Sequence, residues 1–465
     1  MTAPSSGTAI SGGAAHAPGK VPRTRNPRRR AELGLILFGL VIVGIAYVLA
    51  ALGRSKSLPT NVIPFLCGIL ALFVVAHIVV RRFAPNADPM ILPVSVLLNG
   101  IGYVFIARLN SQLAVQQAGW TLIGIVGFAA TLIVVRRVRI LERNRYTIGL
   151  IGVLLVLLPL IPGIGVSING SKIWTRIGPI SFQPGEFAKI ALAIFFAAYL
   201  VERREVLGMA TWKVGPLRLP DPKALAPLLV AWGFSLMVMM FEKDLGSALM
   251  FFVLFLAITW VGTSQASYLA VGGVLFAGGA FLSWATFSHV QTRVSMWLNP
   301  WSDVKGKGYQ IVQAQYAMGW GGSTGTGLGL GISGRIPYQE TDFIFAIIGE
   351  ELGLLGTSAI LAAFLLLAGT GFRVALACRD PFSKLLATGL TTQFAFQSFL
   401  IMAGVTRLLP LTGVTLPFVS YGGSSLVSNW VLVALLIRLS DQANTQPLVA
   451  PVPTDDEPTT MTARS

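Results

Sequence analysis

Charge, cysteine and histidine are scarce in this chain of 465 residues. Charged residues make up 12% of the sequence, against about 25% in a typical soluble domain, and hydrophobic residues make up 54%. A chain this apolar is not an ordinary soluble enzyme, a disordered protein or a nucleic-acid binder. The two cysteines, Cys67 and Cys378, give neither a disulfide framework nor a metal-binding spacing. The histidines, His16, His77 and His289, do not cluster, so no histidine metal site is expected.

Long apolar runs fill most of the chain instead. A helix that crosses a membrane needs about 20 mostly apolar residues. Twelve segments approach or exceed this length: 33–52, 60–80, 89–107, 117–135, 146–164, 186–201, 225–241, 246–263, 268–286, 343–370, 384–404 and 422–439. These runs are too long for transmembrane strands and do not alternate. The sequence therefore predicts an all-α polytopic membrane protein with about 12 transmembrane helices.

The positions of Lys and Arg predict the orientation. The net charge of +16 could suggest a polyanionic partner, but in so apolar a chain it more naturally reports membrane orientation. If the N-terminus is cytoplasmic, 23 of the 35 basic residues fall in inner segments, 11 in outer loops and one, Lys189, within a span. Because cytoplasmic loops carry an excess of positive charge, we expect both termini inside.

The same pattern divides the chain into parts. Residues 1–32 and 441–465 form polar tails that cannot bury enough apolar surface, so we expect them to be disordered and cytoplasmic. Residues 33–88 hold the first two spans, and residues 89–440 hold the other ten. The large outer loop, 287–342, mixes Gly, Trp and Tyr with charges, and loops of that size are usually functional.

Carboxylates are rare enough to be informative. Eight of the 19 fall on the outer side or in the outer halves of spans: Glu186, Glu242, Asp244, Asp303, Glu340, Asp342, Glu350 and Glu351. Glu350 lies seven residues into its span, about 10 Å along a helix. Ionisable residues at such depth normally face protein or a wet cavity. For Glu350 and Glu351, a functional role and a structural ion pair are equally good interpretations.

Two further groups of charges mark the outer ends of spans. Glu186 and Lys189 are three residues apart, so they share a helix face and can pair with each other or bind a ligand. Glu242, Lys243 and Asp244 fill a very short connection and must lie at or just below the membrane surface. The plain alternative for that connection is a salt-bridged turn.

Cations surround one acid in the large outer loop. Asp303 is the only carboxylate of residues 299–310, and Lys305 and Lys307 follow it closely. A carboxylate can accept a proton from a sugar hydroxyl while lysines neutralise phosphate, so this pattern suits a general base that faces a phosphorylated substrate. The plain alternative is an Asp-capped turn.

Two other segments have a structural interpretation as well as a functional one. The segment with Lys172, Trp174 and Arg176 is basic and aromatic, so it could meet anionic headgroups or simply lie at the interface. The glycine-rich segment 325–331 resembles a phosphate loop only superficially, because it lacks the strand and the Gly-Lys-Ser/Thr ending. We assign it to close backbone packing or loop flexibility.

Seven short motifs follow one another over residues of about 95–440. They are Asn169-Gly170-Ser171-Lys172, Gln183-Pro184-Gly185-Glu186-Phe187-Ala188-Lys189, Glu242-Lys243-Asp244-Leu245-Gly246, Asn299-Pro300 to Asp303 with Gly308-Tyr309-Gln310, Thr341-Asp342-Phe343-Ile344-Phe345-Ala346, Gly349-Glu350-Glu351-Leu352-Gly353 and Pro417-Phe418-Val419-Ser420-Tyr421-Gly422-Gly423-Ser424-Ser425. With these motifs the chain resembles the SEDS family (shape, elongation, division and sporulation), the RodA/FtsW peptidoglycan polymerases. Gly185 stands where the family often has Ser. The overall pattern is closer to the elongation, RodA-like branch.

The resemblance implies a ten-helix SEDS core, preceded here by two extra N-terminal helices, in the bacterial cytoplasmic membrane. It implies an inverting glycosyltransferase that polymerises lipid II at the outer face for cell elongation and shape, with Asp303 as the catalytic base. The candidates for substrate binding are Lys172, Arg176, Glu186, Lys189, Lys243, Asp244, Lys305, Lys307, Ser420, Ser424 and Ser425. A divalent cation, Mg²⁺ or Mn²⁺, could assist the leaving pyrophosphate, with ligands that the sequence does not identify, and no nucleotide is needed. The implied partner is a class B penicillin-binding protein transpeptidase.

Two other functions fit parts of the sequence. A lipid II flippase or secondary transporter would also have many spans and buried charges, but its site normally lies at the midplane, whereas these carboxylates gather on the outer side. A non-enzymatic scaffold of a cell-wall synthase is the second alternative. Asp303 separates it from a polymerase, because a scaffold should tolerate the loss of this carboxylate.

Overall fold

The computed structural model describes residues 28–55, 62–168, 171–178, 180–208, 212–214, 217–219, 222–332 and 334–445. The expected tails therefore lie mostly outside the described residues, as do Asn169 and Gly170 of the first motif. Helices account for most of what is described, as the sequence predicts.

A helix lies at each of the twelve positions where a span is expected. They are α1 (Arg28–Ser55), α2 (Val62–Phe83), α3 (Ile91–Leu109), α4 (Ser111–Val134), α6 (Arg145–Leu157), α7 (Gly185–Gly208), α8 (Pro222–Glu242), α9 (Leu245–Thr263), α10 (Ser267–Thr286), α13 (Ile344–Ala377), α14 (Pro381–Val405) and α15 (Gly423–Thr445). Within the described ranges, nine of these helices are long and apolar enough to cross a membrane; α2, α6 and α7 are the other three. A polytopic membrane protein is confirmed, and the count of 12 spans stays a prediction.

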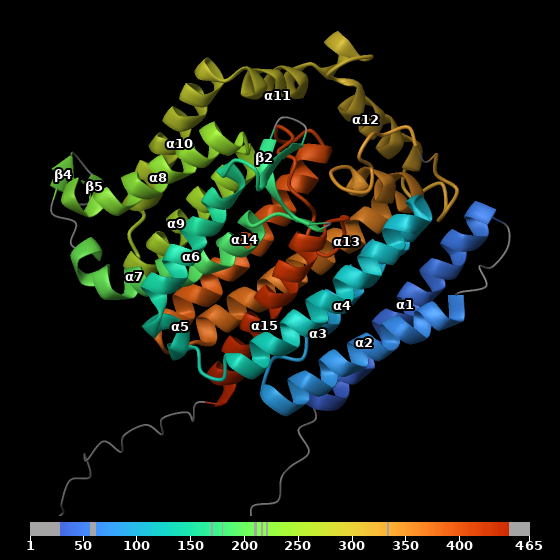
Figure 1. Cartoon of the computed structure of the whole chain (residues 1–465), viewed down its shortest axis with the longest axis horizontal. Coiled ribbons are helices and arrows are strands. Elements are labelled where there is room, and N and C mark those ends of the chain that lie inside the picture. Colours follow the sequence, from blue (N-terminus) through green and yellow to red (C-terminus); the bar gives the residue numbers. More distant parts are fainter. Residues whose placement is uncertain are drawn as a thin grey trace, which may run out of the picture.

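The long helices lie side by side in one bundle (Figure 1). Helices α15 and α3 are the most enclosed, with 89% and 83% of their apolar windows buried, whereas α1 and α10 bury only 22% and 17%. The exposed apolar side chains of α1 and α10 suit contact with lipid. We call the end of the bundle that carries α11 (Ser288–Leu298) and α12 (Tyr309–Gly321) the loop end, and the end that carries α5 (Arg139–Arg143) the tail end (Figure 1).

An aromatic side chain packs the middle of α15 (Gly423–Thr445) into the bundle. Trp430 is fully buried, and the rings of Phe128 and Phe418 meet it edge-on at 5.7 and 5.2 Å between centroids. Its indole N–H donates to the Asn99 side chain at 3.1 Å, so the one polar atom of the ring is satisfied inside the bundle.

Arg438 closes the tail end of the bundle. Its guanidinium is buried, donates to the carbonyls of Phe83 at 2.6 Å and Leu132 at 2.5 Å, and pairs with Asp441 at 3.4 Å. Asp441 in turn accepts from the amide of Asn86 at 2.8 Å. One arginine thus ties α15 to the ends of α2 and α4.

These contacts correct the expected boundaries of both tails. Helix α15 continues to Thr445 because Asp441 is anchored, although 441 was expected to begin a disordered tail. Helix α1 begins at Arg28 rather than after residue 32, and its buried Glu32 bonds to His77 of α2 at 2.7 Å. The polar composition predicts disorder, but the residues next to each tail stay helical where a charged side chain has a buried partner.

Two small antiparallel sheets were not expected in an all-α protein. The first consists of β1 (Gly165–Ile168), β2 (Ser171–Ile177) and β3 (Ile180–Phe182), with β2 in the middle. The second is the pair β4 (Trp212–Val214) and β5 (Leu217–Leu219). Each links two helices over a short distance, where a hairpin satisfies the backbone without adding to the apolar bundle. The first sheet lies at the loop end.

The glycine-rich segment is packed onto a break in α13. The helix is interrupted at Gly353 (φ 65°, ψ −162°), and the freed carbonyls of Glu350 and Glu351 accept from the amides of Thr326 and Gly327 at 2.9 and 3.0 Å. The side chain of Glu351 forms an ion pair with Arg108 and also accepts from the amide of Gly329 at 2.9 Å. Close backbone packing is thereby confirmed for residues 325–331, and the structural interpretation holds for Glu351.

Glu350 has the same kind of structural contact. Its side chain accepts from the amide of Ile332 at 2.8 Å. On the other side of the segment, Gly329 lies so close to Ala50 and Gly53 that a β-carbon on either glycine would collide with backbone. Helix α1, one of the two extra helices, therefore supports the same loop.

The break in α13 predicts a contrast between two glycines of one helix. Gly353→Ala should destabilise the protein by about 1–3 kcal/mol, because φ is positive there and a β-carbon would meet the backbone of Ser323 and Gly325. Gly369→Ala is the matched control, since nothing lies within 4 Å of a β-carbon at that position. Thermal unfolding of the purified protein in detergent measures both, and an equal effect of the two changes would refute the break.

Candidate active site

A buried ion pair joins three helices at the loop end. Glu186 and Lys189 occupy the start of α7 and are only 4% and 2% exposed. The Lys189 ammonium donates to Glu186 Oε1 and to the side-chain oxygen of Gln397 in α14, both at 2.8 Å. Ser428 of α15 donates to the second oxygen of Glu186 at 3.2 Å. The pairing, one of the two interpretations that the three-residue spacing allows, is present in the structure, and its partners show that it also holds α7, α14 and α15 together.

The three serines of the Ser-Tyr-Gly-Gly-Ser-Ser motif have different hydrogen-bond partners in the structure. Ser424 accepts from the amide of Gln183, next to the Glu186 turn, at 2.8 Å. Ser420 donates to the carbonyl of Thr341 at 2.5 Å and accepts from the amide of Leu416 at 3.0 Å. Ser425 bonds to Asn429 one turn further along α15. All three are buried, so only a rearrangement would bring them to a ligand.

The Glu242–Lys243–Asp244 connection is not a salt-bridged turn. Asp244 caps α9 by accepting from the amide and hydroxyl of Ser247 at 3.1 and 2.5 Å, and it forms no ion pair among the described residues. Lys243 adopts a left-handed conformation (φ 57°) and is exposed. Glu242 is buried, and its Oε1 has no hydrogen-bond partner in the described part of the chain.

Asp342 and Arg293 face this connection from the large loop. Arg293 of α11 donates to the carbonyls of Leu411 and Thr412 at 3.2 and 2.7 Å. Burial raises the pKa of Asp342 to about 6, while the nearby Arg293 cation acts in the opposite direction. Asp244 also acts on Asp342 electrostatically, so carboxylates from two distant motifs lie near each other.

The connection between α14 and α15, residues 406–422, clamps the large loop onto the bundle. Arg407 donates to the carbonyls of Trp297 and Leu298, both at 3.1 Å, and its own carbonyl accepts from the Trp297 indole at 3.0 Å. Gln315 of α12 donates to the carbonyl of Val405 at 3.0 Å. Both helices of the loop are thus fixed to the end of α14.

Asp303 lies between these two clamped helices. It ends the short 3₁₀ helix η2 (Pro300–Asp303), is exposed, and accepts from the amide of Lys307 at 2.9 Å through Oδ2. The side chains of Lys305 and Lys307 are exposed as well. The Asp-capped turn is therefore present, and it holds the carboxylate at the surface beside two cations.

Lys172 and Arg176 present two more exposed cations on β2. The neighbouring Ser171 donates to the carbonyl of Lys243 at 3.2 Å, which places the strand beside the Glu242–Asp244 connection. No hydrogen bond or ion pair in the described ranges joins Asp303, Lys305 or Lys307 to the Lys189 cluster. The structure thus brings most predicted residues to the loop end, in a buried group and an exposed group.

Sequence reasoning missed Gln397 and Ser428, which complete the Lys189 cluster. Gln397 also donates to the carbonyl of Thr415 at 2.9 Å, so it links the cluster to the 406–422 connection. The available signal was an amide side chain in the middle of the apolar segment 384–404.

Comparison with known proteins identifies the family of this chain. Residues 90–445 match the family model of the FtsW, RodA and SpoVE cell cycle proteins. The chain belongs to this family. A peptidoglycan glycosyltransferase RodA of Mycobacterium tuberculosis H37Rv is 44% identical over 427 residues, which cover 90% of this chain and 91% of that protein. A probable peptidoglycan glycosyltransferase FtsW of Geobacter metallireducens is 34% identical over 372 residues, covering 77% and 96%.

Solved structures of the family agree. A structure described as the structural coordination of polymerization and crosslinking by a peptidoglycan synthase complex has a TM-score of 0.64 and 25% identity, covering 78% of this chain and 99% of that one. The Thermus thermophilus rod shape determining protein RodA has a TM-score of 0.55 and 24% identity, covering 78% and 98%. Because the family model begins at residue 90 and the mycobacterial match covers 90% of the chain, that match includes part of the segment that forms α1 and α2.

Metal binding is not supported by side chains alone in this family member. Among the described residues, no group of three or more His, Cys, Asp or Glu could hold a metal ion. Glu242 and Asp244 are two neighbouring carboxylates. The presence of a divalent ion stays a prediction.

Lys189→Met should strongly destabilise the protein, although it removes a single ammonium group. The variant leaves Glu186 buried without its cation, so we expect a loss of about 3–5 kcal/mol in the free energy of unfolding. Lys172→Met is the matched control, because Lys172 is exposed on β2 and should cost less than about 0.5 kcal/mol. Thermal or denaturant unfolding in detergent measures both. Equal stability of the two variants would contradict the described network.

The raised pKa of Asp342 predicts a pH-dependent stability difference. The folded state favours protonated Asp342, so ionisation costs stability as pH rises from the ordinary carboxyl pKa of 3.8 to about 6. Relative to Asp342→Asn, the wild type should lose stability across this interval and show a constant difference above it. Unfolding temperatures of both proteins from about pH 4 to pH 8 measure this difference. A difference that does not change with pH would show that the surroundings of Asp342 do not raise its pKa.

Proposed function

We propose that this protein is a peptidoglycan glycosyltransferase that polymerises lipid II into glycan strands for cell elongation and shape. The mycobacterial relatives named RodA support this activity through 44% identity over nine-tenths of the chain. The observation that carries the proposal is Asp303, a surface carboxylate held in a turn beside Lys305 and Lys307 at the loop end of an apolar bundle. A lipid-linked sugar pyrophosphate needs both an apolar bundle and a charged surface, because its tail stays in the membrane and its sugars stay in water.

An apolar cavity of about 490 Å³ supports a lipid substrate. It lies among α8, α9, α10, α11 and α14, and its walls include Trp232, Phe252, Phe276 and Leu400. Towards the loop end the cavity reaches Thr412, whose carbonyl accepts from Arg293. We assign the polyprenyl chain of one substrate to this cavity. Its pyrophosphate would then lie towards the charged residues of the loop end.

Asp303 is the base in the proposed reaction. The 4-hydroxyl of the acceptor GlcNAc attacks the anomeric carbon of the donor, Asp303 takes the hydroxyl proton, and the bond to the lipid pyrophosphate breaks. An α-linked donor that gives a β-1,4 link requires inversion, so one displacement and one base suffice. Oδ2 of Asp303 is occupied by the Lys307 amide, which leaves Oδ1 as the oxygen for the substrate.

The cations of the loop end stabilise the leaving pyrophosphate in this proposal. Lys172, Arg176, Lys243, Lys305 and Lys307 are all exposed there, so they can approach a phosphate without breaking a buried pair. Glu186, Lys189, Asp244, Ser420, Ser424 and Ser425 act differently. These residues are buried and already hydrogen-bonded. We therefore assign them to positioning the site rather than to direct contact with the substrate.

Orientation and partner complete the proposal. We infer that both termini face the cytoplasm and the loop end faces outward, supported by the 23 basic residues on the inner segments against 11 on the outer loops. We also infer a class B penicillin-binding protein as partner, supported by the structural similarity to a synthase complex that coordinates polymerization and crosslinking. The two enzymes would then act at the same membrane face.

Asp303→Asn should abolish polymerisation without unfolding the protein. The amide oxygen can still accept from Lys307, so the turn should persist, but an amide cannot usefully accept the hydroxyl proton. General-base catalysis contributes about 10²–10⁴-fold, so turnover should fall by that factor while lipid II binding changes little. The assay is conversion of labelled lipid II per unit of purified protein with its partner.

Glu142→Gln serves as the control for that assay, because Glu142 belongs to α5 at the opposite end of the bundle. It should polymerise within about twofold of wild type. Near-normal polymerisation by a folded Asp303→Asn variant would remove Asp303 from the mechanism.

A further inference from the structure

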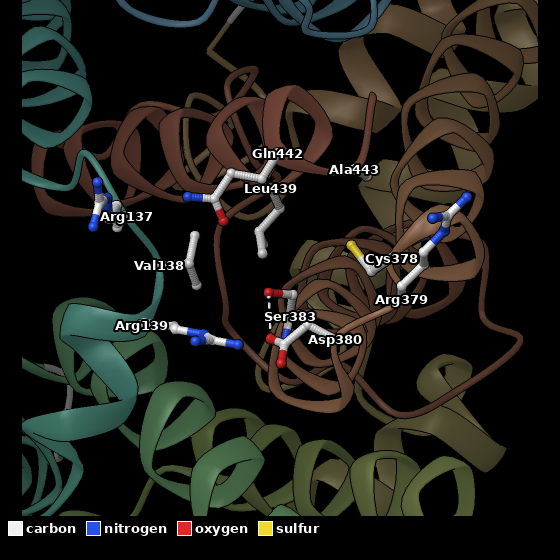
Figure 2. A pocket seen from close by; sticks show the side chains of 10 residues that line it. All are labelled: Arg137, Val138, Arg139, Cys378, Arg379, Asp380, Ser383, Leu439, Gln442 and Ala443. Atoms are coloured by element: carbon white, nitrogen blue, oxygen red, sulfur yellow. Dashed lines mark hydrogen bonds between the residues drawn. The ribbon is translucent and has the colours of Figure 1, made fainter. Parts of the chain in front are cut away.

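A small pocket at the tail end lies where α5, the start of α14 and the end of α15 meet (Figure 2). Its volume is about 220 Å³. Arg137 and Arg139 line it around the start of α5, and Asp380 and Ser383 line it around the start of α14. Sites for drug-sized molecules usually have about 300–1,000 Å³, so this pocket suits one or two side chains rather than a whole cofactor.

Two arginines of this pocket present their charge to solvent. Arg137 and Arg139 occupy one side of the pocket, and Asp380 and Ser383 occupy the other (Figure 2). Both arginines are exposed, and neither forms an ion pair with another residue of the described ranges. Glu142 interacts electrostatically with Arg139, while Asp380 accepts from the amide and hydroxyl of Ser383 at 3.0 and 2.8 Å. The arginines can therefore bind a further carboxylate, each through two parallel hydrogen bonds.

The remaining wall of the pocket belongs to the most enclosed helix of the bundle. Leu439, Gln442 and Ala443 of α15 line the pocket, and 89% of the apolar window of α15 is buried. This wall therefore lies at the centre of the bundle, away from the helices whose apolar side chains face outward. A peptide from the aqueous side can reach it more directly than a lipid at the perimeter of the bundle.

The chain itself carries an acidic segment that follows this wall. Helix α15 ends at Thr445, and residues 446–465 come after it, outside the described ranges. Residues 455–457 are Asp, Asp and Glu, and Arg464 is the one basic residue of 446–465. Residue 455 lies ten positions beyond Thr445. Because an extended chain covers about 3.3–3.6 Å per residue, this acidic segment can reach about 33–36 Å from the end of α15.

We propose that the acidic segment 455–457 binds this pocket of its own chain through Arg137 and Arg139. An exposed ion pair is weak, with an effect of about threefold on binding. The covalent connection offsets this weakness, because a short tether gives an effective concentration on the order of millimolar. The bound segment links the end of α15 to the starts of α5 and α14. The inference depends neither on the glycosyltransferase activity nor on the proposed orientation.

A protease that cleaves before aspartate tests whether the segment is bound. The full-length protein in detergent is treated with endoproteinase Asp-N, and intact mass measures the loss of the chain from residue 455 onward. Arg137→Gln and Arg139→Gln should each speed this cleavage about threefold, and the double variant about tenfold, because the protease acts on the released segment. Arg143→Gln is the matched control and should leave the rate nearly unchanged, since Arg143 is exposed at the other end of α5 and does not line the pocket.

Carbodiimide cross-linking tests the contact itself. Arg137→Lys keeps the positive charge and supplies an amine, which the reagent joins to a nearby carboxylate as an amide. Peptide mass spectrometry should find residue 137 linked to the acidic segment 455–457. Arg143→Lys is the control, and its amine should give little or none of this link. If the glutamine variants have lower unfolding temperatures than the wild type, the cross-link alone decides.

Equal cleavage rates in the wild type, the folded double variant and Arg143→Gln would overturn the proposal. A cross-link found only in covalent dimers would also overturn it, since the tail of a second copy would then occupy the pocket. Loss of the cross-link when phosphatidylglycerol is added to the micelles would have the same consequence, because a lipid headgroup would then hold the arginines.

Discussion

Buried ion pairs join the helices of this apolar bundle. Lys189 meets Glu186 and Gln397 at the start of α7, Arg108 meets Glu351 at the break in α13, and Arg438 meets Asp441 at the tail end. Each pair also bonds to a helix or loop distant in sequence. Since an unpaired buried charge costs several kcal/mol, these few contacts fix the relative positions of helices whose apolar surfaces alone would allow sliding.

The exposed part of the site depends on the buried part through the 406–422 connection. Gln397 bonds both to Lys189 and to the carbonyl of Thr415, while Arg407 and the carbonyl of Thr412 hold α11. Asp303 lies in η2, which follows α11 in the chain. The position of Asp303 therefore depends on the contacts that hold α11, and these are linked through Gln397 to the buried ion pair. A change at Lys189 can therefore disturb the reaction without Lys189 touching the substrate.

Much of the fold and part of the site could be predicted from the sequence because they depend on local patterns. The apolar runs predict the positions of the helices, and the three-residue spacing shows that Glu186 and Lys189 can pair. The sequence could not predict partners from distant segments, such as Gln397, Ser428 and Arg108, since nothing local specifies them. The break at Gly353 and the sheet around β2 were also missed, because short irregular segments are decided by packing with neighbours. The salt-bridged turn at Lys243 was a wrong alternative, since Lys243 is exposed and Asp244 caps α9 instead.

The most direct test of the account is the fate of lipid II in sealed vesicles that contain the purified full-length protein and its transpeptidase partner. The account predicts that fluorescent lipid II on the outer-facing leaflet is converted into a ladder of glycan strands, and that a muramidase which cleaves the β-1,4 link removes the ladder. Movement of intact lipid II between leaflets without any ladder would contradict it and favour a flippase. Unchanged lipid II, in the presence of a folded complex, would favour a scaffold.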